Sequence, residues 1–252
     1  MVNVATELKP YISPFSLRHD NTLKWTNMTS KEIPMQNGML NVPHTIADLI
    51  KDLAVVGVIG SAQCKRLYVR SDTSKKISKA IDLGILKRHE LIRNNQIIPL
   101  YTLGATGMYL AGLDYEDEFN YWRKYSEEDV LQRLVFFQLY GQMKDLEKMQ
   151  VLNTEDPFVA SIKIHEIEFK VLVLRGNETV VQNYFRYEKD IPSHIVIVAE
   201  GLNHILPIQD AIKPYADRIR LTTDERLKLP FGEMFYYFDQ NKWVLENTTN
   251  KV

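Results

Sequence analysis

The sequence predicts an α+β protein with an N-terminal winged helix-turn-helix, a long linker helix and a C-terminal mixed α/β domain. Three observations lead to this class. After residue 43, apolar residues recur at helical spacing in three short segments, and two strand-like segments follow them. A long helical pattern begins near residue 126. Beyond residue 156, short apolar runs alternate with helix-like segments, which is typical of a sheet with crossing helices.

Length and composition indicate a folded, globular protein and exclude several other classes. The chain has 252 residues, of which 45% are hydrophobic and 25% charged, so we expect a folded protein with a sizeable core. The single cysteine, Cys64, excludes an internal disulfide and a cysteine-rich zinc site. No segment approaches the roughly 18 apolar residues of a membrane span, and the first residues lack the apolar stretch of a secretory signal. We therefore expect a cytoplasmic protein with no membrane partner.

Residues 1–42 are expected to form an N-terminal arm. Prolines and a glycine interrupt this stretch, which has no long helical or strand period. Its apolar residues predict that the arm packs on the rest of the protein, and they are Tyr11, Ile12, Phe15, Leu17 and Trp25.

Residues 43–112 are predicted to form the winged helix-turn-helix. Its first helix follows Pro43, with Thr45 as a cap, and ends at Gly57. Ser71 or Asp72 is expected to cap the third helix. The further elements, in chain order, are helices over 61–69 and about 72–83, and strands over 85–92 and 96–103.

Residues 113–155 are predicted to hold an acidic connector and a long helix that starts at Ser126 and runs to about Gln150. Acidic residues fill the first turn, where the helix dipole favours them. The apolar side chains cover more than one face, so the helix either lies buried between two domains or pairs with its equivalent in a dimer. We expect a homodimer, because DNA-binding proteins with one winged helix per chain often span two half-sites about 34–36 Å apart.

Residues 156–252 are predicted to form the α/β domain. Its expected elements are strands over 159–164 and 168–174, a helix over 178–190, a strand over 194–199, a helix over 208–215, a strand over 218–222, and a terminal hairpin of 234–238 with 242–245.

The winged-helix segment is strongly basic although the whole chain has a formal charge of −1. Between residues 61 and 100 there are nine basic and three acidic residues, a net charge of +6. The third helix separates its lysines from its apolar residues, with Lys75, Lys76 and Lys79 on one face and Ile77, Ala80 and Ile81 on the other.

A charge run is most often a solvated helix face, and a winged helix also serves protein–protein contact. Here the helix order, the lysines of the third helix and the basic hairpin tip agree, so we expect binding to double-stranded DNA. The predicted DNA-binding residues are Lys65, Arg66, Arg70, Ser71, Thr73, Ser74, Lys75, Lys76, Ser78, Lys79, Lys87, Arg88, Arg93, Asn94 and Asn95.

The stretch from Thr45 to Gly112, which ends in PLYTLGATGMYLAG, resembles the replication-relaxation proteins that plasmids and mobile elements carry. The resemblance extends over roughly residues 43–245 as an order of elements. It implies a winged helix followed by a domain similar to a degenerate restriction-endonuclease fold. It also implies a role in plasmid or mobile-element replication, mobilisation or transcription control.

Restriction-type nucleases place an Asp at one strand and Glu-x-Lys on the next, where the carboxylates bind Mg²⁺ and the Lys positions water. Asp156, Glu168 and Lys170 match this order. Glu-x-Lys is common by chance, however, and Asp156 precedes Pro157 as turn residues do. We expect a non-catalytic domain without metal or cofactor. A Mg²⁺-dependent endonuclease or nickase is one alternative, and a ligand-responsive transcription regulator is the other.

Overall fold

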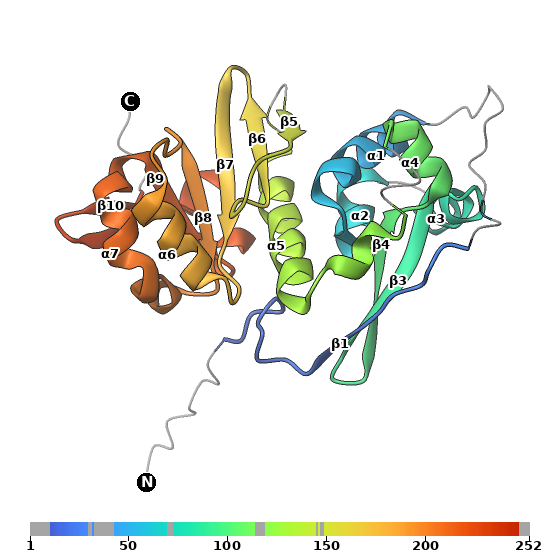
Figure 1. Cartoon of the computed structure of the whole chain (residues 1–252), viewed down its shortest axis with the longest axis horizontal. Helices are drawn as coiled ribbons and strands as arrows, with labels where there is room; N and C mark the ends of the chain where they lie inside the picture. Colours follow the sequence, from blue (N-terminus) through green and yellow to red (C-terminus); the bar gives the residue numbers. More distant parts are fainter. Residues whose placement is uncertain are drawn as a thin grey trace, which may run out of the picture.

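The computed structural model describes residues 11–29, 32, 43–69, 73–113, 119–144, 146 and 149–246. It has two units, one on each side of a long helix, α5, over Glu127–Met143 (Figure 1). The N-terminal unit comprises residues 43–113 and one strand from the arm. The C-terminal unit comprises residues 149–246. Helices and strands are mixed throughout, so the α+β class is confirmed.

The N-terminal unit has a four-stranded antiparallel sheet in the order β1-β3-β4-β2. Its elements are β1 (Asn21–Lys24), α1 (His44–Val56), β2 (Ile59–Gly60), α2 (Ser61–Tyr68), α3 (Thr73–Asp82), β3 (Leu86–Arg93), β4 (Gln96–Leu103) and α4 (Ala105–Ala111), followed by a 3₁₀ turn at Tyr121–Lys124.

Turn residues explain where these elements begin and end. Gly57, with φ of +92°, ends α1 as predicted. Pro43, not Thr45, occupies the N-cap of α1, so the predicted side-chain cap is wrong. Asn94 and Asn95 both have positive φ, which is the backbone that a two-residue hairpin turn between β3 and β4 requires. The predicted caps of α3, Ser71 and Asp72, lie outside the described residues.

The long helix is shorter than the sequence predicts. Ser126 caps it as expected, since its hydroxyl accepts a hydrogen bond from the amide of Asp129. The predicted end near Gln150 is wrong, because α5 ends at Met143 and Gln150 lies in strand β5 (Met149–Leu152). Leu146 continues the helical spacing of apolar residues, but pairing of β5 with β6 requires the chain to leave the helix before that strand.

Helix α5 is buried on both sides within one chain. Ten of its 17 residues are buried, and the helix contacts α2 and β2 of one unit and β7 of the other. The apolar surface from which the sequence predicts a dimer is therefore already covered. The homodimer stays a prediction, and α5 is not available as its interface.

The C-terminal unit is a seven-stranded sheet in the order β11-β10-β9-β8-β7-β6-β5. Strands β7, β8 and β9 are parallel, and the other pairs are antiparallel. Helix α5 covers one face, and α6 and α7 cover the other (Figure 1). The remaining bounds are β6 (Ala160–Ile164), β7 (Ile167–Val173), α6 (Glu178–Tyr187), β8 (Ile195–Ala199), α7 (Gln209–Ile212), β9 (Ile219–Thr223), β10 (Tyr236–Asp239) and β11 (Lys242–Leu245).

The helix predicted over 208–215 is wrong in length, because α7 has only four residues and lies between 3₁₀ segments. Pro214 explains why α7 ends early. It lacks an amide hydrogen, and its ring obstructs the carbonyl of the preceding turn, so a regular α-helix from Gln209 cannot continue through it.

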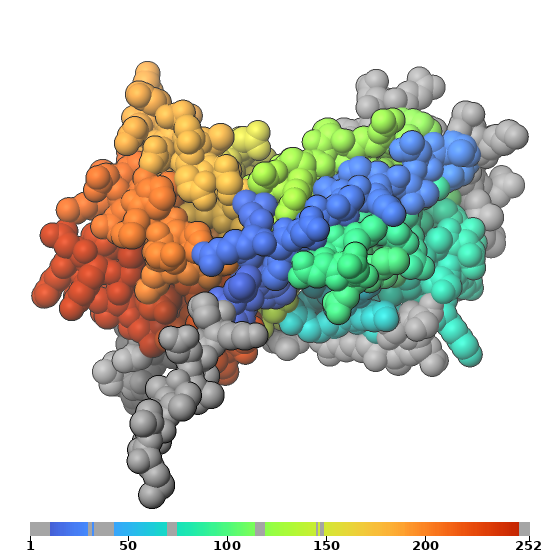
Figure 2. Space-filling model, turned by 90° about the horizontal axis from the view of Figure 1, so that it is seen from below, coloured from blue at the N-terminus to red at the C-terminus, as the bar shows by residue number. Residues whose placement is uncertain are grey.

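The arm crosses both units (Figure 2). At one end, Ser13 donates a hydrogen bond to the carboxylate of Asp224, and the carbonyl of Phe15 accepts one from Arg175 Nε at 2.9 Å. Further along, β1 pairs with β3, and Asn21 donates to Glu127 of α5. Four residues of the arm thus complete a sheet, which the sequence pattern does not predict.

His89 fastens the arm to the N-terminal unit. The ring is fully buried between Trp25 of the arm and Trp122, with centroids 4.9 Å and 4.8 Å away. Nδ1 accepts a hydrogen bond from the amide of Thr26, so Nε2 carries the proton and donates to Thr102 Oγ1. Burial, together with the nearby charge of Lys87, lowers the pKa of His89 to about 3.

Acid should therefore destabilise the protein through His89. The folded-state pKa lies below the usual 6.5, so the unfolded state takes up a proton first. We expect the free energy of unfolding to fall by about 1.4 kcal/mol for each pH unit below 6.5. Urea titrations at several pH values between 7 and 4.5 measure this slope. In His89→Gln the slope should be shallower by that amount, and equal slopes in the two proteins would contradict the assignment.

A buried ion pair lies beneath the other end of the arm. Arg175 follows β7 and Asp224 follows β9, and Arg175 Nη2 lies 2.5 Å from Asp224 Oδ2. The two side chains are 2% and 1% exposed. Burial raises the pKa of Asp224, an effect that Arg175 and the Ser13 hydroxyl oppose.

Removal of one partner should leave the other charge buried and unpaired. Asp224→Ala is expected to lower the free energy of unfolding by about 3–5 kcal/mol, measured by urea titration. Glu246→Ala is the matched control. It breaks the Arg220–Glu246 pair, in which both side chains are partly solvated, and should cost less than about 1 kcal/mol. Similar losses in the two variants would contradict the buried role of Asp224.

Candidate nucleic-acid interface

Helix α3 has one buried and one exposed side. Ile77 and Ala80 are buried in the core of the N-terminal unit, where α3 packs on β3. The predicted DNA-binding residues Lys75, Lys76, Ser78 and Lys79 are exposed. Figure 1 places α3 at the end of the N-terminal unit that is remote from the C-terminal unit. The helix therefore presents its lysines outward at one end of the molecule.

Lys65 and Arg88 lie on the same side of the sheet as α3. Both are exposed. Arg88 is opposite Tyr101 in the β3–β4 register, and Tyr101 packs in the same core cluster as Cys64 of α2 and Ile77 of α3. The other sheet face holds Leu91 and Leu100, which pack against α5. We call the set of Lys65, Lys75, Lys76, Ser78, Lys79 and Arg88 the α3 surface.

Three further basic residues that the sequence predicts to bind DNA make contacts inside the chain. Lys87 forms an ion pair with Glu32 of the arm, with Nζ 2.8 Å from Oε1. Arg93 Nε donates to Asn21 Oδ1 at 3.0 Å, and Arg66 Nη2 lies 3.5 Å from Gln138 Oε1 of α5. Lys87 and Arg93 alternate with Arg88 along β3, so their side chains point to the opposite sheet face.

The hairpin tip is separate from the α3 surface. Asn94 and Asn95 are exposed, and the amide of Asn94 donates to the carbonyl of Asp20 in the arm. Strand β3 has eight residues, so the tip lies about 25 Å along the strand from the end next to α3. Arg70 and Ser71 lie outside the described residues, as do the side chains of Thr73 and Ser74.

The candidate nuclease residues are only partly brought together. Glu168 and Lys170 alternate along β7, and Lys170 Nζ lies 2.5 Å from Oε1 of Glu155. Asp156 is exposed in a turn before β6. On β6 itself, the residues opposite Glu168 and Lys170 are Lys163 and Ser161. Glu155 is thus the acidic partner that sequence reasoning missed, although its position beside Asp156 was a usable signal.

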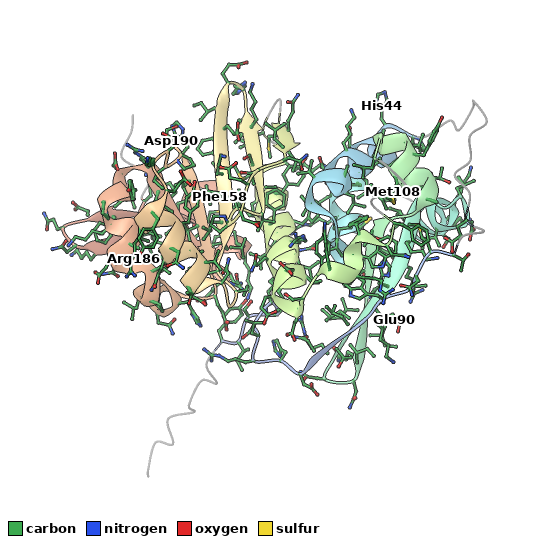
Figure 3. The ribbon with its side chains drawn as sticks, in the orientation of Figure 1. His44, Glu90, Met108, Phe158, Arg186 and Asp190 are labelled. Carbon is green, nitrogen blue, oxygen red and sulfur yellow. The ribbon has the colours of Figure 1, made fainter. Side chains whose placement is uncertain are left out.

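The surroundings of Lys170 are acidic and aromatic. Phe158 is labelled in Figure 3. Its ring lies 5.7 Å from Lys170 Nζ and packs edge-on against Tyr184 of α6. Burial, with the nearby charges of Glu155, Glu188 and Asp190, raises the pKa of Tyr184 to about 12. Among the described residues, no three His, Cys, Asp or Glu side chains are grouped to hold a metal ion.

No protein-family model matches the chain, and a search of curated proteins finds no similar sequence. The resemblance to replication-relaxation proteins therefore stays a prediction. Within the part of the chain that the structure describes, no helix has the length and apolar character needed to cross a membrane.

Proposed function

We propose that the N-terminal unit is a winged helix that binds double-stranded DNA through the α3 surface. One observation carries the proposal. Strand β2, between α1 and α2, pairs with β4, so three helices and a hairpin form one small unit from which the lysines of α3 project. This order supports the proposal, because a helix-turn-helix protein places its recognition helix in the major groove.

The dimensions and charge of α3 support this function. Its ten residues make a rod of about 15 Å, and the major groove admits an α-helix. Lys75, Lys76 and Lys79 would neutralise backbone phosphates and release counterions. Ser78 is exposed among them and offers a hydroxyl to a phosphate or a base edge. Lys65 of α2 and Arg88 of β3 add exposed positive charge in the same unit.

The process that this DNA binding serves rests on the resemblance alone. We propose plasmid or mobile-element replication, mobilisation or transcription control, with a homodimer spanning two half-sites. The contacts of Lys87 and Arg93 with the arm support a role of these two residues in the fold, whereas Arg66 is exposed beside α5 and stays a predicted DNA-binding residue.

Alanine at Lys75, Lys76 and Lys79 together tests the DNA-binding role. Because this variant can no longer neutralise three phosphates, the slope of log affinity against log salt should fall by about 2–3. Duplex affinity at low salt should fall at least about tenfold. Fluorescence anisotropy with a labelled mixed-sequence duplex, repeated at several salt concentrations, measures both.

The matched control is the triple alanine variant at Lys189, Lys213 and Lys242. These lysines are exposed on the C-terminal unit, and their loss changes the net charge by the same amount. The control should bind duplex as the unmodified protein does. If both triple variants lose equal affinity, net charge and not the α3 surface governs binding, and the proposal fails.

The topology of the C-terminal unit favours a second candidate function. The order of its elements is similar to that of a restriction-endonuclease-like core. Helix α5 comes first, followed by the antiparallel strands β5, β6 and β7, then by helix α6 and the parallel strand β8. We propose a degenerate, non-catalytic version of that fold. Glu155 neutralises Lys170, and the strand beside Glu168 offers Lys163 in place of an acid.

A nicking assay distinguishes a non-catalytic domain from an active nuclease. We expect incubation of supercoiled plasmid with the protein and Mg²⁺ or Mn²⁺ to give no more open-circular product than Glu168→Ala/Lys170→Ala gives. Agarose gel densitometry measures the product. Metal-dependent nicking that disappears in the double variant would establish a nuclease and overturn the non-catalytic proposal.

A further inference from the structure

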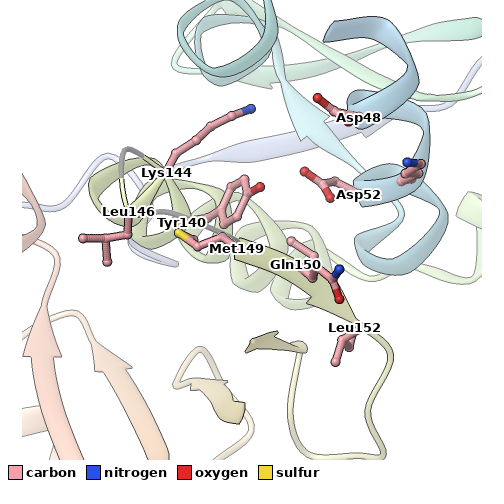
Figure 4. Close-up of a pocket in the computed structure, with 10 residues that line it drawn as sticks. Asp48, Asp52, Tyr140, Lys144, Leu146, Met149, Gln150 and Leu152 are labelled. Carbon is pink, nitrogen blue, oxygen red and sulfur yellow. The ribbon is translucent and has the colours of Figure 1, made fainter. Parts of the chain in front are cut away.

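The seven-stranded sheet of the C-terminal unit has two edges, and they differ in what lies beside them. At one edge, β5 contacts α1, and residues of both elements line a pocket together with the end of α5 (Figure 4). At the other edge, β11 pairs with β10 alone among the described strands. The β11 edge is therefore the one that can accept a further strand.

The geometry of the β10–β11 hairpin determines how the backbone of β11 is hydrogen-bonded. Its turn consists of Gln240 and Asn241, which both have positive φ, as a two-residue turn requires. Asp239 and Lys242 flank this turn and form the first hydrogen-bonded pair of the ladder. In an antiparallel ladder, such pairs alternate with pairs that exchange no hydrogen bonds. Every second residue of β11 therefore directs its amide and carbonyl at β10.

The intervening residues of β11 direct their backbone groups outward. The amide of Glu246 donates to the carbonyl of Phe235 at 2.9 Å, which continues the alternation that begins at the turn. Trp243 and Leu245 lie between the inward-bonded positions, so their amides and carbonyls face away from β10. These groups require another strand or water as their partner.

Strand β11 lacks the side chains that usually prevent pairing at a sheet edge. Natural edge strands are often protected by proline, by bulges or by charged residues within the strand. Strand β11 is regularly paired, contains no proline, and has the apolar residues Trp243, Val244 and Leu245 in succession. Its one charged residue, Lys242, lies at the end of the strand. Nothing in its sequence therefore blocks the addition of a strand.

The sequence of β11 is complementary to itself in the antiparallel direction. If Trp243 of one copy lies opposite Leu245 of another, the outward backbone groups form about four hydrogen bonds. Val244 then lies opposite Val244 of the second copy, on the two-fold axis. In the same register, the exposed Lys242 lies opposite Glu246 of the second copy. A shift of two residues in either direction removes this ion pair, so charge and backbone geometry select one register.

Glu246 can form this pair although it already contacts Arg220. Its Oε2 lies 3.1 Å from Arg220 Nε, and both side chains are partly exposed. A carboxylate has two oxygens that accept several hydrogen bonds, so Glu246 can bind the ammonium of Lys242 as well. Because an exposed ion pair contributes little to affinity, its role is to fix the register, and the backbone and apolar contacts supply the affinity.

We propose that β11 pairs antiparallel with β11 of a second copy, so that the two C-terminal sheets of a homodimer become one continuous sheet. Identical strands meet across a two-fold axis, as a closed symmetric dimer requires. The inference rests on the proposed function in one respect, because it names the interface of the homodimer proposed there. The pairing itself does not depend on DNA binding.

This interface determines where the two DNA-binding surfaces lie. Figure 1 shows β10, the neighbour of β11, and α3 at opposite ends of the molecule. Two copies joined at β11 therefore carry their α3 surfaces at the two ends of an elongated dimer. Such a dimer is suited to two duplexes, or to two distant sites on one duplex, rather than to half-sites on neighbouring helical turns.

Sedimentation equilibrium of the full chain tests the interface. The unmodified protein should associate reversibly from one chain to two between about 1 and 200 µM, as expected of a small interface. Leu245→Pro removes an outward amide but no hydrogen bond between β10 and β11, so the dissociation constant should rise at least about tenfold. Lys242→Ala, which removes only the exposed ion pair, should change it less than about threefold. A single-chain mass at every concentration, or equal association of Leu245→Pro, would overturn the proposal.

Cysteine cross-linking tests the register with variants that leave pairing intact. Two copies of Val244→Cys would face each other on the axis with Cα atoms about 4.5 Å apart, within reach of a disulfide. Lys242→Cys is the matched control on the same strand and face, but its two copies would lie about 13 Å apart along the strand. Cys64 is fully buried, and burial raises its pKa to about 12, so it does not compete.

Oxidation should give a covalent dimer on a non-reducing gel with Val244→Cys and not with Lys242→Cys. Equal yields from the two variants, or no dimer from Val244→Cys, would contradict this register.

Capture of a second duplex separates this inference from the proposed function. A biotinylated duplex on beads should retain a free fluorescent duplex through the unmodified dimer. Leu245→Pro should bind a single duplex but capture no second one. The triple alanine variant at Lys75, Lys76 and Lys79 should dimerise normally and capture none. A dimer that does not bind DNA would overturn the proposed function alone, whereas a dimer that binds one duplex without capturing another would overturn the arrangement inferred here.

Discussion

Burial of α5 is the constraint on which both units depend. Val130, Leu131 and Leu134 fill the space behind β3 and β4, and Val135, Phe136 and Phe137 lie in the cluster that includes the strands β6 to β8. Because the two sheets share one helix, neither core is complete without it. A helix covered on both sides loses the regular division into apolar and polar faces, which explains why its sequence pattern suggests a second, external partner.

The arm adds a second connection between the units, of a different kind. It joins them by polar contacts at its ends, with Ser13 on Asp224 and Thr26 on His89, and by strand pairing in between. It also determines which basic side chains are available on the surface. Glu32 forms an ion pair with Lys87, and Asn21 accepts a hydrogen bond from Arg93. The basic side chains on that face of the hairpin therefore contact the arm, and exposed positive charge is left on the opposite face of the sheet, where Arg88 lies.

Local signals were sufficient for most of the helices and for the β3–β4 hairpin, but not for the strands β1, β2 and β5. Gly57, the Asn94–Asn95 turn and the spacing of apolar residues predict the helices and the hairpin, and the lysines of α3 are exposed as their spacing indicates. Contacts between residues that are distant in the chain could not be predicted from the sequence. The Lys87–Glu32 pair joins residues far apart in the chain, and only the fold brings Lys170 to Glu155. Likewise, the sequence around Leu146 does not show that the helix ends before it, because Leu146 keeps the helical spacing of apolar residues. The alternation of Lys87 and Arg88 along β3 was readable in advance, since neighbouring residues of a strand face opposite sides.

The arm's attachment has a consequence for the order in which the protein folds during synthesis. Ser13 leaves the ribosome early, but its acceptor Asp224 follows 211 residues later. The arm therefore cannot finish docking until the chain has emerged as far as Asp224. Until then the C-terminal sheet also lacks its last parallel strand, β9, which ends one residue before Asp224. Attachment of the arm at Ser13 is thus a late event of synthesis, and a product that stops before Asp224 keeps only the contacts of the arm with the N-terminal unit and with residues that precede Asp224.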